Sequence, residues 1–167
     1  MQADLSPVIA ATAQWLTRSF PAPGGAMATA LCEVQARQAV TVAARLRYPT
    51  EMDAALVGLA GPGGSGRLDW VTGADVADGD EDWRTWVDEV VASWAVCLLA
   101  DAGLAATAVD AVRGGGPAAE FRRLVSPDEG DRRAAVLLRH PDLVAPVAGL
   151  HRPALLSRLD PDTTLVG

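Results

Sequence analysis

The two histidines of the chain, His140 and His151, are the first candidates for acid–base chemistry, because a free imidazole titrates near neutral pH. His140 stands directly before Pro141, and His151 stands before Arg152. Neither has a serine or cysteine nucleophile pattern around it, and the sequence contains no G-x-S-x-G elbow. We therefore expect both histidines to be surface or turn residues, and we do not expect a hydrolase triad.

Two further segments could bind a ligand. The loop GPGGSG at 61–66 lacks the Lys and Ser or Thr of a phosphate-binding loop, and Arg67 with a strand-like RLDWV follows it. We therefore expect a connecting loop. An acidic run lacks the spacing of a calcium-binding loop, so we interpret it as a solvated helix N-terminus; it comprises Asp75, Asp78, Asp80, Glu81 and Asp82.

The cysteines and tryptophans favour structural roles. Cys32 and Cys97 lie far apart among Ala, Leu and Val, which predicts two buried thiols rather than a disulfide or a metal site. Trp83, Trp86 and Trp94 follow helical spacing and are expected in a core or a dimer interface. A stacking platform for a planar cofactor is the alternative for these indoles.

Composition excludes several classes of protein. Half of the 167 residues are apolar, which is typical of a globular domain. The net charge is −7, all 14 basic residues are arginines, and no basic stripe occurs, so we expect no nucleic-acid partner. No apolar run reaches the roughly 18 residues of a membrane span, and the N-terminus lacks the basic flank of a secretory signal. We expect a cytoplasmic protein without a membrane partner.

The elements that must position these residues follow from the apolar pattern. Helical spacing predicts helices at 4–18, 51–60 and 82–102, the last ending at a Gly103 cap, and an alanine-rich helical start at residue 26. Alternation and β-branched content predict strands at 38–48, 67–76, 105–112 and 132–140. A short helix at 117–125 and a proline-punctuated tail at 143–167 complete the chain. We predict one α+β domain, residues 1–167, with a sheet around a long central buried helix.

Two long segments, 86–112 and 118–141, resemble the C-terminal half of the nitroreductase-like flavin enzymes. The resemblance rests on an A-G-L turn after a long helix, on a short helix closing in L-x-x-P-D, and on an aliphatic strand before a proline. The matching residues are Ala102, Gly103, Leu104, Leu124, Pro127, Asp128, Ala134 to Leu138 and Pro141. More weakly, RSFPAPGGAMATALCEV at 18–34 is similar to a segment of the peptide azoline dehydrogenase branch.

The resemblance implies a nitroreductase-like sheet, an FMN cofactor and a homodimer whose central helix is both core and contact, with 143–167 wrapping over the partner. It places flavin contacts in the segment similar to the azoline dehydrogenases and at the arginines of the tail. The implied cofactor-binding residues are Arg18, Ser19, Gly24, Gly25, Arg152 and Arg158. Arginine suits such a role because its guanidinium can hold a phosphate bidentately.

The resemblance leaves two functions open. One is an FMN-dependent oxidoreductase acting on a small molecule or peptide, in natural-product or modified-peptide biosynthesis, where the flavin carries the hydride. The other is a non-catalytic partner or scaffold protein, paired with itself or a related subunit, that has lost flavin binding. The family's N-terminal R-R-S-x-R motif has no counterpart beyond Arg18 and Ser19, which favours the second function. The arginines of the tail favour the first.

Overall fold

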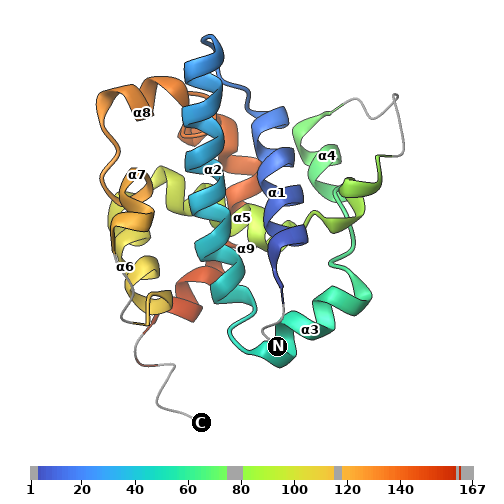
Figure 1. Ribbon diagram of the computed structural model, residues 1–167. Coiled ribbons are helices and arrows are strands. Elements are labelled where there is room, and N and C mark those ends of the chain that lie inside the picture. Colours follow the sequence, from blue (N-terminus) through green and yellow to red (C-terminus); the bar gives the residue numbers. More distant parts are fainter. Residues whose placement is uncertain (1–3, 75–80, 115–117, 161, 163–167) are drawn as a thin grey trace.

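A computed structural model describes residues 4–74, 81–114, 118–160 and 162 of the chain. Every regular element within these residues is a helix, and no strand occurs among them (Figure 1). The predicted α+β class, with a nitroreductase-like sheet, is therefore wrong. The chain folds as a helical bundle in which short connections join helices of very different length.

The α-helices range in length from 4 to 22 residues. Two short 3-10 helices, Asp82–Trp86 and Ala118–Phe121, interrupt the series of α-helices. The α-helices are α1 Ser6–Ser19, α2 Ala26–Arg47, α3 Glu51–Ala60, α4 Gly66–Thr72, α5 Glu89–Ala100, α6 Ala102–Val112, α7 Arg122–Val125, α8 Glu129–Ala134 and α9 Pro141–Leu159. The predicted helices at 4–18 and 51–60 are confirmed as α1 and α3.

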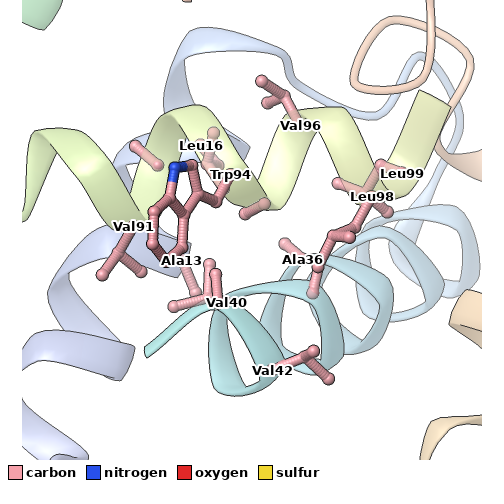
Figure 2. Packing of buried hydrophobic residues seen from close by; sticks show 14 of the residues in the cluster. Ala13, Leu16, Ala36, Val40, Val42, Val91, Trp94, Val96, Leu98 and Leu99 are labelled. Atoms are coloured by element: carbon pink, nitrogen blue, oxygen red, sulfur yellow. The ribbon is translucent and has the colours of Figure 1, made fainter. Parts of the chain in front are cut away.

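The centre of the bundle is α5, which packs mainly against α2 on one side and α9 on the other. Its sequence EVVASWAVCLLA is apolar around almost the whole circumference, a composition typical of a helix enclosed on all sides. Figure 2 shows Val91 and Trp94 of α5 beside Val40 of α2 and Leu16 of α1. The predicted central buried helix therefore exists, although helices rather than a sheet enclose it.

The predicted strand at 38–48 is the second half of α2. Its apolar residues do not alternate strictly, because Ala39 and Val40 are followed four residues later by Ala43 and Ala44, and all four are fully buried. That spacing matches a helix as well as it matches a buried strand. Since α2 contacts α1 as well as α5, α6 and α8, it buries more than one face and loses the polar stripe that identifies an amphipathic helix.

The other three predicted strands are also wrong. Residues 67–72 continue α4, which ends at Gly73 in the left-handed conformation (φ 70°), and 75 and 76 lie outside the described residues. Residues 105–112 belong to α6, whose N-cap Asp101 accepts a hydrogen bond from the Leu104 amide at 3.0 Å. Residues 132–140 finish α8 and then form turns up to residue 139. Runs of small apolar residues made these helical and turn segments look like strands in the sequence.

The contacts of Arg139 explain why residues 135–139 form turns against the bundle. Its guanidinium donates to Gln35 Oε1 at 2.8 Å, to the Leu99 carbonyl at 2.8 Å and to the Arg123 carbonyl at 3.0 Å. Gln35 in turn donates to the Asp131 carbonyl at 2.8 Å. Burial lowers the pKa of the Arg139 guanidinium. These contacts join four separate parts of the chain, and no local pattern in the sequence shows them.

The helix predicted at 82–102 is divided. Residues 82–86 form a 3-10 helix, Val87 and Asp88 are extended, and α5 begins only at Glu89. The cap of α5 is Asp88, whose Oδ1 accepts from the amides of Val90 and Val91 at 2.9 and 3.1 Å. The predicted cap at Gly103 is wrong, because α5 ends at Ala100 and its C-cap is Asp101. The same Asp101 is the N-cap of α6.

The segment predicted as a surface tail from residue 143 is helical as far as Leu159 and buries Val144, Val147 and Leu155 against the bundle. It bends at His151, where the backbone leaves helical geometry (φ −136°) two residues before Pro153. The end of the predicted tail, at 161 and 163–167, lies outside the described residues. No helix in the described ranges is long and apolar enough to cross a membrane.

Candidate partner-binding groove

An open groove of about 690 Å³ lies between α1 and α2. Because a short turn joins the two helices, they run antiparallel, and the C-terminal end of α1 faces the first turns of α2. The groove is lined by Ala10, Ala13, Gln14, Thr17, Arg18, Pro21, Ala22, Thr29, Ala30, Cys32, Glu33, Val34 and Arg37. From Ala10 to Arg18 it follows roughly 12 Å of helix axis.

Small side chains make this groove. Ala10, Ala13 and Ala30 present only a methyl group each, so the two helices leave open space where larger residues would fill it. The turn that joins the helices is tight at Gly24, where a Cβ atom would lie 2.7 Å from the Ala28 Cβ. Gly24 therefore allows the chain to reverse closely over the start of α2.

One wall of the groove carries exposed apolar surface. Val34 is 42% exposed, and Met27, seven residues earlier on the same side of α2, is 75% exposed. A solvent-facing helix surface usually carries polar residues at such positions. Cys32 lies beneath this wall, and burial raises the pKa of its thiol, so it is a neutral, apolar part of the lining.

Charges of both signs border the groove. Arg18 donates to Glu81 Oε2 at 3.0 Å and stacks over the Trp83 ring at 5.1 Å, so it is already engaged at one end. Arg37 lies toward the other end and forms no ion pair with any residue that the structure describes. Glu33 lies between them on α2. An occupant with an acidic end therefore finds a guanidinium group at Arg37.

The structure divides the six residues that the resemblance assigned to FMN. Arg18, Ser19, Gly24 and Gly25 surround the α1–α2 turn, next to the groove. Arg152 and Arg158 lie on α9, and Arg158 Nε donates to the Leu46 carbonyl at 3.2 Å, at the far end of α2. The two groups are thus separated by roughly 30 Å of α2 and cannot hold one phosphate within a single chain.

The histidines take structural positions. His151 Nε2 lies 2.6 Å from Glu89 Oε2, and its backbone amide donates to Ser93 Oγ at 3.0 Å. Ser93 Oγ donates to the Ala148 carbonyl at 3.1 Å, so this hydroxyl is committed to the bend of α9. His140 is exposed at the start of α9. The Ser93 hydroxyl near His151 therefore bonds to the backbone of α9 at both of these contacts.

A second buried polar cluster surrounds Asp69, which is 3% exposed. Its carboxylate accepts from Trp15 Nε1 at 2.8 Å, from Ser65 Oγ at 2.7 Å and from Arg84 at 3.0 Å. No buried side-chain nitrogen or oxygen in the described residues lacks a partner. These polar groups therefore hold helices together by bonding to one another across the interior.

Other chemical predictions can be compared with the described residues. Cys32 and Cys97 are free and buried, as expected. The described residues contain no group of His, Cys, Asp and Glu that could hold a metal ion. Of the acidic run, Asp75, Asp78 and Asp80 lie outside the described residues. The loop at 61–66 leads into α4 instead of a strand, with Gly61, Gly63 and Gly64 at positive φ.

The resemblance implied a central helix that is both core and dimer contact, and residues 91–99 of α5 are buried within this single chain. Trp94 is 4% exposed, and its indole nitrogen donates to the His151 carbonyl at 3.0 Å within the same chain. Trp83 and Trp86 lie in the 3-10 helix before α5 and are partly buried against the core. Their helical spacing in the sequence thus reflects two separate elements.

Comparisons of the chain with protein-family models, with curated proteins and with solved structures give no match. What the groove can bind follows from its shape, its lining and its charge. Sequence reasoning missed the groove itself, although Ala10, Ala13, Thr17 on one helix and Ala30, Val34 on the next are spaced at three and four residues. That spacing places small residues on one side of each helix, and such sides can flank a groove.

Proposed function

We propose that this protein is a non-catalytic helical scaffold that binds a partner by accepting an amphipathic helix in the α1–α2 groove. The observation that carries the proposal is the groove itself, with alanine methyl groups in its lining, an exposed apolar wall and, at one end, an arginine that forms no ion pair within the described part of the chain. Helix-in-groove binding is a common mode of peptide recognition, in which apolar anchors three or four residues apart enter such a surface.

The dimensions support this occupant. About 12 Å of groove accommodates two to three turns of an α-helix. The small residues of the lining allow a close backbone approach, and the exposed Val34 offers apolar contact to the side chains of a guest. Arg37 favours a guest whose first turn is acidic, because acidic residues are also preferred at helix N-termini.

A peptide titration tests this function. The probe is a fluorescein-labelled amphipathic helix of about twelve residues with an acidic first turn, and the control probe is the same composition scrambled. We expect the ordered probe to bind, and we expect Ala30→Glu and Arg37→Glu to weaken binding about tenfold by placing negative charge in the groove. Val136→Glu, at an exposed position outside the groove, is the matched control and should leave binding unchanged.

The peptide titration can also refute the proposal. Equal binding of the ordered and scrambled probes, or full binding by both groove variants, would show that the groove is not the binding site. Circular dichroism of each variant checks that the helices persist, and Glu is a good helix former at both substituted positions.

FMN binding is a second candidate, which one observation favours. Arg18 and the turn with Gly24 and Gly25 adjoin both the groove and the N-terminus of α2, where free amides and the helix dipole attract anions. A bound flavin would supply hydride transfer, with a peptide or small molecule as substrate. Arg18 would exchange its contact with Glu81 for the phosphate.

Visible absorbance tests this second candidate. Flavin bands that survive dialysis, or quenching of added FMN fluorescence that Arg18→Ala weakens and Arg152→Ala does not, are the expected results if the turn holds the phosphate. A colourless protein that leaves added FMN unquenched contradicts flavin binding and leaves the scaffold function as the sole proposal.

A further inference from the structure

Helix α3 carries apolar side chains on two opposite faces. Ala54 and Val57, three residues apart, are buried at 5% and 7% exposure and attach the helix to the rest of the chain. Met52, Leu56 and Leu59, at spacings of four and three residues, share the other face and are 69%, 57% and 88% exposed. A surface helix normally presents polar residues there, so α3 lacks a partner for this face.

Few contacts hold α3 in place, yet it is a well-formed helix. No extensive contact joins it to another described helix, and in Figure 1 it lies at the lower edge of the molecule, outside the group around α5. Its first turn is closed by a capping box, in which Thr50 Oγ1 accepts from the Asp53 amide at 3.1 Å and Asp53 accepts from the Thr50 amide at 3.2 Å. The helix is therefore presented as a preformed unit.

The exposed face of α3 matches the groove in length. Met52 to Leu59 covers about 10 Å of helix axis, against roughly 12 Å between Ala10 and Arg18 along the groove. Two large aliphatic side chains and a methionine would meet alanine methyl groups and the exposed Val34. Large side chains opposite small ones are the arrangement that close packing requires.

The charges also match. The first turn of α3 carries Glu51 and Asp53, and α3 has no basic residue in its last turn. With this acidic turn beside Arg37, the C-terminal end of α3, where the helix dipole is negative, lies toward Arg18. One orientation of the helix therefore places negative charge beside each guanidinium group at the two ends of the groove.

We propose that α3 of one copy of this chain occupies the α1–α2 groove of a second copy, and that two copies form a homodimer. The inference rests on the proposed groove function and names its occupant. A two-fold dimer makes the contact twice, because each copy offers both a helix and a groove.

The mass of the intact chain in solution tests this dimer. Sedimentation equilibrium at about 100 μM, where even a dimer with a micromolar Kd is populated, should give twice the chain mass. Leu56→Glu should raise the dissociation constant at least about tenfold. Leu143→Glu, which changes a leucine on α9 that is 47% exposed, should leave it unchanged.

A charge exchange tests the orientation of α3 in the groove. Arg37→Glu and Glu51→Arg should each weaken the dimer, and the double variant should recover most of the loss. Two weak single variants without recovery in the double variant would overturn the pairing of Arg37 with Glu51.

The outcomes separate this inference from the function on which it rests. A wild-type chain that stays monomeric at this concentration overturns the homodimer, and the scaffold function still stands if the labelled amphipathic peptide binds. A dimer that both Leu56→Glu and Ala30→Glu leave intact also overturns the inference, because it must use another surface. Failure of both dimer and peptide binding removes the proposed function as well.

Discussion

Asp88 shows how one residue can fix the geometry of the bundle. Its carboxylate caps α5 through Oδ1 and accepts the Tyr48 hydroxyl through Oδ2, while its amide donates to Thr12 Oγ1 at 3.1 Å. Three helices therefore meet at this point, at the ends of α2 and α5 and within α1. Burial and the neighbouring Asp88 raise the pKa of Tyr48, so its hydroxyl remains a donor throughout the ordinary pH range.

Replacement of Asp88 by alanine should be strongly destabilising. The change removes a helix cap, worth about 1 kcal/mol, and leaves the partly buried Tyr48 hydroxyl without its acceptor, at a cost of about 1–3 kcal/mol. Urea denaturation should show a loss of about 2–4 kcal/mol in the free energy of unfolding. Asp88→Asn retains a capping oxygen and should lose less; an equal loss in both variants would contradict the capping role.

At the scale of elements, the bend of α9 depends on α5. Pro153 has no amide hydrogen and prevents a regular helix at His151, so the His151 amide and the Ala148 carbonyl turn to Ser93. The His151 carbonyl accepts from Trp94 at 3.0 Å. Ser93 and Trp94 of α5 thus form hydrogen bonds with the backbone groups that the bend of α9 leaves without partners in its own helix.

Ser93→Ala should therefore cost about 1–3 kcal/mol, because the partly buried His151 amide loses its acceptor and the Ala148 carbonyl keeps only the Cys97 thiol as a donor. In a Pro153→Ala background, α9 can restore its internal hydrogen bonds, and the cost of Ser93→Ala should shrink. A double-mutant cycle from thermal or urea unfolding measures this coupling. Additive losses would show that Ser93 acts independently of the bend.

The elements that the sequence predicts correctly are those with clear local boundaries. α1 begins at Ser6–Pro7, and α3 lies between the cap Thr50 and Gly61 at positive φ. Among the helices mistaken for strands, α2 is packed on several sides and shows no continuous polar face from which a period could be read. The helices α4 and α8 have only seven and six residues, so their sequences are too short to show a helical period. Contacts such as Arg139 with Gln35, 104 positions apart, decide the turns and have no local signal.

The α1–α2 groove was also hard to predict, because it depends on contacts between residues that are far apart in the sequence. Arg18 lines the groove, as a residue of the predicted flavin site, but the groove exists only because α1 and α2 pack side by side. The resemblance joined Arg18 to Arg158 through a fold that the chain does not adopt. The exposed face of α3 could have been read from Met52, Leu56 and Leu59, since these residues and the buried Val57 make the helix apolar on two sides.

In the whole molecule, the α1–α2 groove and the exposed apolar face of α3 occur on the same chain. The interior polar groups in the described residues all have partners, so the surface offers the remaining capacity for binding. The chain carries a net charge of −7 and so repels an acidic helix overall, and Arg18 and Arg37 at the two ends of the groove offset this repulsion locally.

Nuclear magnetic resonance spectra of the ¹⁵N-labelled chain across a dilution series can locate the dimer contact residue by residue. We expect the amides of Ala10, Ala30 and Val34 in the groove to shift together with those of Met52 and Leu56 in α3, along one concentration dependence. Leu56→Glu should remove the concentration dependence of the three groove amides. Shifts confined to other helices would contradict the groove as the binding site for this helix, as would unchanged spectra at every concentration.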